Sequence, residues 1–162
     1  MTTKDLFIDQ FRACYDEENW FAPLNKVLGG LTPAQASWKD GSQNHSILQL
    51  VHHLIFWNER YLLRFKELSL PELKESKEDL TFEIDIKDWE LTLKKLNEVF
   101  SELRDSFSNS DEAKLQSSPF KDSTDPWYSV IANINIHNAY HIGQIIYIRK
   151  LQGSWVKEKE QK

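Results

Sequence analysis

Four long stretches of this chain repeat apolar residues at intervals of three and four, and no other feature limits the fold as strongly. The clearest stretch covers about residues 87–107. Its apolar positions alternate between steps of four and three: Trp89, Leu93, Leu96, Phe100, Leu103 and Phe107. These steps place one apolar stripe along an α-helix, as in the seam of a helix bundle. The pattern predicts a helix that is buried along one side.

Two further helical stretches precede it. The first covers about residues 4–28, and Pro23 is expected to kink or divide it, because proline removes a backbone hydrogen bond and clashes with the preceding turn. The next covers about residues 47–68, and Ser46 is a suitable cap for its first turn.

The last long helix is expected to begin at Asp125 and Pro126, a cap followed by proline in the first turn, and to end before Gly153. Two short helices are expected in the connections. One covers residues 33–37, and the other is a single turn at about residues 111–114.

The strand-like alternation of residues 82–86 has no second strand to pair with, so we predict an all-α fold. Four helices of this length make a four-helix bundle, with short extra helical turns in the loops. The 162 residues fit one domain, which we place at residues 1–156. The charged sequence KEKEQK at residues 157–162 is expected to be a solvated tail.

The overall charge and cysteine content narrow the functional classes. With 20 basic and 25 acidic residues, the net charge is −5, which argues against a protein that grips nucleic-acid phosphates. The single cysteine, Cys14, cannot form an internal disulfide and suits a reducing compartment. No signal-peptide pattern and no membrane-length apolar run are present. We therefore expect a cytoplasmic protein with no membrane partner.

Three of the five histidines are predicted to point into the core. His137 and His141 are four residues apart, so they project from one face of the last helix, and this face carries its apolar stripe. His53 lies on the stripe of the 47–68 helix, three residues after Leu50 and four before Trp57. Its neighbour His52 is rotated by about 100° and lies on the flank.

Core histidines of this kind have two readings. A buried histidine is commonly a neutral packing residue that makes hydrogen bonds. Three imidazoles among apolar neighbours, however, need partners for their nitrogens, and a divalent metal would satisfy three of them at once. Three histidine ligands also leave an open position for water or substrate. The metal site requires the second and fourth long helices to be adjacent, which spacing alone does not establish.

Two motifs of the chain resemble the DinB-like superfamily of metal-binding four-helix bundles, which includes the YfiT-type hydrolases. The first motif is NHSI at residues 44–47, followed by VHHL at residues 51–54 and by Trp57. The second is HNAYHIGQI at residues 137–145. The resemblance covers essentially the whole chain, including the sequence LTPAQASW between the first two long helices.

The resemblance implies that His53, His137 and His141 bind one divalent ion, of zinc, nickel or iron. His52 is the competing candidate if the helix is rotated, and His45 is expected at a loop or pocket rim. The resemblance also implies a homodimer and a small-molecule substrate. The catalytic residues and the residues that bind a co-substrate remain unknown at this stage.

Two activities follow from this resemblance. A metal-bound thiol becomes a thiolate and a metal-bound water becomes a nucleophile, so the site would suit an S-transferase that uses a low-molecular-weight thiol, or a hydrolase of a small amide. The resemblance makes transfer the first expectation. No acidic residue falls on the stripe beside the histidines to serve as a general acid or base, which weakens the hydrolase alternative. A non-enzymatic bundle that binds metal or ligand is the third possibility.

A few polar residues near the motifs have two possible roles each. Gln144 and Asn138 would either orient the histidines or make ordinary surface or interhelical hydrogen bonds. Arg60 and Arg149 would either anchor the carboxylates of a thiol or lie on the surface. Cys14 is expected to be a packing residue.

Overall fold

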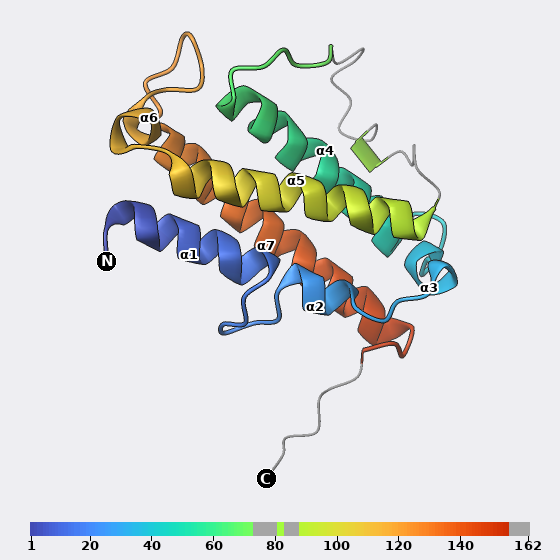
Figure 1. The fold of residues 1–162 in the computed structure, drawn as a ribbon. Helices are drawn as coiled ribbons and strands as arrows, with labels where there is room; N and C mark the ends of the chain where they lie inside the picture. The colour runs from blue at the N-terminus through green and yellow to red at the C-terminus, as the bar shows by residue number, and fades with distance from the viewer. Residues whose placement is uncertain (73–80, 83–87, 156–162) are drawn as a thin grey trace.

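The computed structural model describes residues 1–72, 81–82 and 88–155. Every regular element in these ranges is helical, and Figure 1 shows their arrangement. Four helices are long: α1 (Thr3–Tyr15), α4 (Ile47–Phe65), α5 (Trp89–Asn109) and α7 (Trp127–Leu151). Three short helices lie in the connections: α2 (Leu24–Leu28), α3 (Pro33–Ser37) and α6 (Glu112–Gln116). The all-α prediction is therefore confirmed.

The four long helices form a bundle in which each packs against two others. Helix α5 lies against α1 and α4, and α7 lies against the same two helices from the other side. Helices α4 and α7, which carry the three core histidines, are therefore neighbours. Within the described ranges, no helix has both the length and the apolar character needed to cross a bilayer.

Most helix starts agree with the sequence expectations. Thr32 begins α3 and Ser46 begins α4, and each takes part in a capping box with the residue three positions later. The expected cap at Asp125 is wrong, because Pro126 occupies the cap position of α7 and no side chain accepts a hydrogen bond there.

The expected tail and most of the strand-like run at 82–86 lie outside the described residues.

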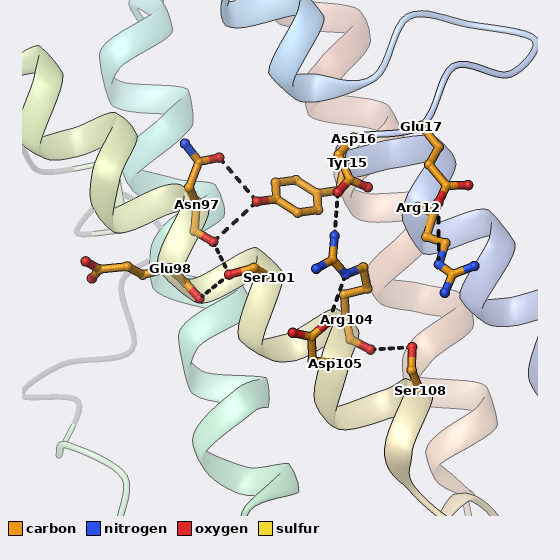
Figure 2. A network of polar contacts seen from close by, with 10 residues as sticks. All are labelled: Arg12, Tyr15, Asp16, Glu17, Asn97, Glu98, Ser101, Arg104, Asp105 and Ser108. Atoms are coloured by element: carbon orange, nitrogen blue, oxygen red, sulfur yellow. Dashed lines mark hydrogen bonds and ion pairs between the residues drawn. The ribbon is translucent and has the colours of Figure 1, made fainter.

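The first long stretch differs most from its prediction. Helix α1 ends at Tyr15, and the chain is not helical again until Leu24, so the break is wider than a kink at Pro23. A tertiary contact lies at this break: Asp16 is the cap residue at the end of α1, and its carboxylate accepts a hydrogen bond from Arg104 of α5 (Figure 2). The same network joins the Tyr15 hydroxyl to Asn97 at 3.3 Å.

At one end of the bundle, the core contains a chain of aromatic side chains that touches all four long helices. Phe107 of α5 lies between Phe11 of α1 and Phe65 of α4, with ring centroids 5.9 and 5.0 Å away. Phe65 in turn packs edge-on against Trp127 of α7 at 4.8 Å. Edge-to-face aromatic pairs of this kind contribute beyond their buried area. This core holds α4 against α7 at the end remote from α3.

Candidate metal centre

The three predicted histidines meet between α4 and α7. Nε2 of His137 lies 3.0 Å from Nε2 of His53 and 3.1 Å from Nε2 of His141. One ligand atom from each residue lies within 4.8 Å of the other two. His53 and His141 are buried and His137 is half-buried. The structure thus brings together the residues that helical periodicity turned toward the core.

A pair of asparagines joins the same two helices beside the histidines. The Asn58 amide donates to Oδ1 of Asn138 at 2.9 Å, and the Asn138 amide donates back to Oδ1 of Asn58 at 3.1 Å. Both side chains are almost completely buried. Asn138 therefore makes an interhelical contact and does not touch the histidine rings through this pair. The contact fixes how α4 and α7 are aligned where the ligands lie.

Two polar side chains orient the histidine rings. Nδ1 of His53 lies 2.6 Å from the Thr81 hydroxyl, and Nδ1 of His141 lies 2.7 Å from Oε1 of Gln144. The Gln144 amide also donates to the Tyr140 hydroxyl at 3.2 Å, which points its oxygen toward His141. When the outer nitrogen of a ring is engaged in this way, Nε2 presents its lone pair to the centre of the cluster.

The donor set fits a divalent metal better than it fits three packing residues. With Nδ1 of His53 and His141 protonated, a proton on Nε2 of His137 satisfies only one of its two short contacts. A tetrahedral ion with metal–nitrogen distances near 2.1 Å holds its nitrogen ligands about 3.4 Å apart. The observed 3.0 and 3.1 Å lie within about 0.4 Å of this spacing.

The electrostatics of the cluster keep the rings neutral. Burial, reinforced by the neighbouring imidazoles, lowers the pKa of His53 to about 3. Burial and the proximity of His141 lower the pKa of His137 to about 4, and burial also lowers the pKa of His141. Neutral imidazole is the form that binds metal. The three lone pairs are therefore available at neutral pH without competition from protons.

These pKa shifts predict that the metal-free protein loses stability in mild acid. Unfolded histidine takes up a proton near pH 6.5, whereas folded His53 and His137 resist protonation down to about 3 and 4. The unfolded chain binds more protons in this window. The free energy of unfolding therefore has its full value above pH 6.5 and falls as the pH is lowered. Urea denaturation at a series of pH values between 7 and 5 measures this slope. If His137→Gln left the pH dependence of the free energy of unfolding unchanged, the lowered pKa of His137 would be contradicted.

The cluster opens into a cavity of about 620 Å³. Four aromatic side chains line its walls: Trp57, Tyr61, Phe82 and Tyr140. None of the described residues that line it is Asp, Glu, Lys or Arg. No fourth His, Cys, Asp or Glu in the described ranges joins the three histidines. A set of three histidine ligands by itself leaves an open coordination position.

The two remaining histidines lie outside the cluster. His45 is at the cavity rim, where its ring stacks on Phe82 with centroids 3.9 Å apart, and Phe82 stacks on His53 at 4.1 Å. His52 is turned toward α5, with Nε2 3.4 Å from the Thr92 hydroxyl. His52, the competing candidate, therefore lies outside the group of three histidines.

Sequence reasoning missed Thr81 and Phe82 as site residues; they reach the cluster from the connection between α4 and α5. Their only signal was the strand-like alternation that begins at Phe82, and it does not point to the histidines. The two candidate arginine anchors lie elsewhere. Arg60 donates to the backbone carbonyl of Pro71, and Arg149 is buried against the carbonyls of Val27 and Gly29.

Comparison with known proteins identifies the family of this chain. The family model of the DinB superfamily matches residues 17–145, which is most of the chain and includes both histidine motifs. The chain belongs to the DinB superfamily. No curated protein and no solved structure matches it.

Proposed function

We propose that this protein binds one divalent ion through His53, His137 and His141 and transfers a low-molecular-weight thiol to an electrophilic small molecule. The observation that carries the proposal is a set of three lone pairs at the floor of an open cavity whose described lining has no carboxylate. Zinc, nickel and ferrous iron all accept such a set of imidazoles.

The lack of a carboxylate in the described lining favours a thiol over water as the nucleophile. Hydrolysis needs a group that takes a proton from water and returns one to the leaving amine. A bound divalent ion would lower the pKa of a thiol enough to make a separate base unnecessary. In the transfer step, the thiol loses its proton to solvent, its sulfur forms a bond to the electrophilic carbon, and the leaving group departs with the electron pair.

The chain's own residues supply orientation and binding. Thr81 and Gln144 hold two of the histidine rings with Nε2 inward, and Asn58 fixes the alignment of the helices that carry them. The aromatic walls suit an uncharged, flat electrophile, which buries apolar surface and stacks on the rings. A cationic mouth for the carboxylates of a thiol is not found among the described lining residues, so we expect thiols with few carboxylates to react best.

The test is turnover of monobromobimane by the metal-loaded protein with a panel of thiols. The panel contains 2-mercaptoethanol, cysteine methyl ester, cysteine and glutathione, and His137→Ala is the matched control. We expect a metal-dependent rate that His137→Ala loses, with neutral thiols ahead of glutathione.

Other outcomes would replace the proposal. Cleavage of a small amide without any thiol would indicate the metal-dependent hydrolase. Stoichiometric metal binding without turnover of any electrophile or amide would leave a non-enzymatic metal-binding or ligand-binding bundle.

A further inference from the structure

A second cavity, of about 710 Å³, shares no described lining residue with the histidine cavity. It lies between α1 and α7, which run side by side (Figure 1). The apolar part of its lining comes from α1, from the chain that follows α1, and from α7: Leu6, Ala13, Trp20, Phe21, Ile136 and Ala139. We call this cavity the α1–α7 groove.

The large apolar side chains around the groove are exposed. Trp20 is 99% exposed and Ile136 is 68% exposed, and Leu6 and Phe21 are also exposed. Single apolar residues scattered over a surface are normal, whereas several large ones gathered around one cavity are typical of a site that binds a ligand. The groove therefore offers apolar and aromatic surface to a bound molecule.

The lining also contains a buried amide with an unused acceptor. Asn135 is 4% exposed, and its side-chain amide donates a hydrogen bond to the Phe7 carbonyl at 3.1 Å. No described residue donates a hydrogen bond to its Oδ1. A buried acceptor without a partner costs free energy, and a ligand that donates an N–H or O–H group to it would remove that cost. The groove therefore favours a ligand that carries a hydrogen-bond donor.

Small side chains leave space beside this amide. Ala139 follows Asn135 by one turn and lies on the same side of α7. Ala13 lines the groove from α1. A larger side chain at either position would occupy the space beside Asn135, whereas two alanines leave room for a flat ring. The aromatic ring of Trp20 would then pack against such a ligand.

The charge of the groove favours a cation. Asp9 is the one charged residue among the described lining residues. Its side chain is 55% exposed, and its carboxylate lies 3.9 Å from Nη1 of Arg12. Nε of Arg12 is 3.7 Å from the carboxylate of Glu17, so this one cation is shared between two anions. An ammonium group would be attracted to Asp9, and a carboxylate would be repelled.

One small molecule can reach both polar groups. The Asn135 amide contacts the carbonyl of Phe7, and Asp9 follows Phe7 by two residues on α1. Successive residues of an α-helix rise by about 1.5 Å, so the amide and the carboxylate are within roughly 10 Å of each other. An aromatic ring with a short aminoalkyl chain has a length of this order.

We propose that the α1–α7 groove binds a cationic aromatic amine, which is a flat ring with an N–H or O–H donor and an ammonium group on a short chain. The ring packs against Trp20 and Ala139, its donor meets Oδ1 of Asn135, and the ammonium group faces Asp9. The site needs neither the metal nor the transfer reaction, so it is a separate binding function of this chain.

Calorimetric titration of the full-length chain with tryptamine tests the proposal, because tryptamine has both an indole N–H and an ammonium group. We expect one molecule to bind per chain. Tryptamine methylated on the ring nitrogen lacks the donor and should bind about 5–100-fold more weakly. Indoleacetate has the opposite charge and should bind at least about twofold more weakly. Absence of tryptamine binding, or equal affinity for tryptamine and its ring-methylated analogue, would overturn the proposal.

Substitutions test the two polar contacts. Asn135→Ala should bind tryptamine and the ring-methylated analogue equally, because the acceptor that distinguishes them is gone. Asp9→Asn should weaken tryptamine binding about two- to fivefold. Asp122→Asn is the matched control, since Asp122 is exposed and is not among the lining residues. A preference for tryptamine that persists in Asn135→Ala would refute the contact on which the proposal rests.

Two further variants locate the ligand. Ala139→Leu fills the groove with a side chain that suits a helix, and it should weaken tryptamine binding at least about tenfold. Tyr61→Ala changes the wall of the histidine cavity and should leave tryptamine binding unchanged. The opposite pattern would place the ligand in the histidine cavity and overturn the proposal. The titration contains no thiol and no electrophile, so its result is independent of the proposed transfer activity.

Discussion

Replacing His137 with alanine is expected to abolish stoichiometric binding of a divalent ion while the bundle stays folded. His137 is the middle member of the cluster, with short Nε2 contacts to both other histidines. Removing a residue that orients a ligand typically lowers metal affinity by about 10–100-fold. Removing the ligand itself should lower it more, so we expect metal affinity to fall by at least about 100-fold. Because His137 is half-buried, truncating it disturbs the core little. Elemental analysis of protein purified without an affinity tag measures the result.

Two other histidines provide the controls for this experiment. His52→Gln changes the adjacent histidine of α4, which faces Thr92, and should retain about one ion per chain. His45→Ala changes the cavity rim and should also retain the ion. Circular dichroism checks that each variant is folded. Full metal retention by His137→Ala would refute the three-histidine hypothesis. Loss of metal in His52→Gln would mean that His52, and not its neighbour His53, is the ligand from α4.

Replacing Phe107 with alanine is expected to lower the free energy of unfolding by about 3–5 kcal/mol. The side chain is 1% exposed and packs between Phe11 and Phe65, so its loss leaves a cavity where three helices meet. The midpoint of urea denaturation, at an unchanged slope, measures the effect.

A partly exposed phenylalanine is the matched control for this change. Phe120 is 38% exposed and its ring lies 4.8 Å from the Arg64 guanidinium carbon. Phe120→Ala should therefore cost only about 0.5–1 kcal/mol. A cost for Phe107→Ala as small as this would mean that the core is not packed as described.

Helical periodicity was sufficient to predict the fold and the direction of the three histidines. Side chains three and four residues apart share a face, so the stripe of α4 also carried His53 inward, and that of α7 carried His137 and His141. Capping chemistry is equally local, which explains why the starts of α3 and α4 were predicted correctly.

Contacts between distant segments explain what the sequence did not reveal. Thr81 and Phe82 come from a connection without helical periodicity, and only the folded chain places them beside His53. The end of α1 makes a side-chain contact with Arg104 of α5, far away in the sequence. Gln144 was correctly considered as an orienting residue, because its position three residues after His141 puts both on one face.

Under the proposed metal binding, the distribution of the histidines along the chain would link metal supply to the survival of the folded protein. His53 and His137 are 84 residues apart, so the complete donor set exists only after α4 and α7 have docked. An ion that binds the native chain and not the unfolded one stabilises it by about 1.4 kcal/mol for each tenfold rise in free metal above the dissociation constant. Proteases remove the unfolded fraction, so under the proposed binding the protein would accumulate when its ion is plentiful and be degraded faster when the ion is scarce.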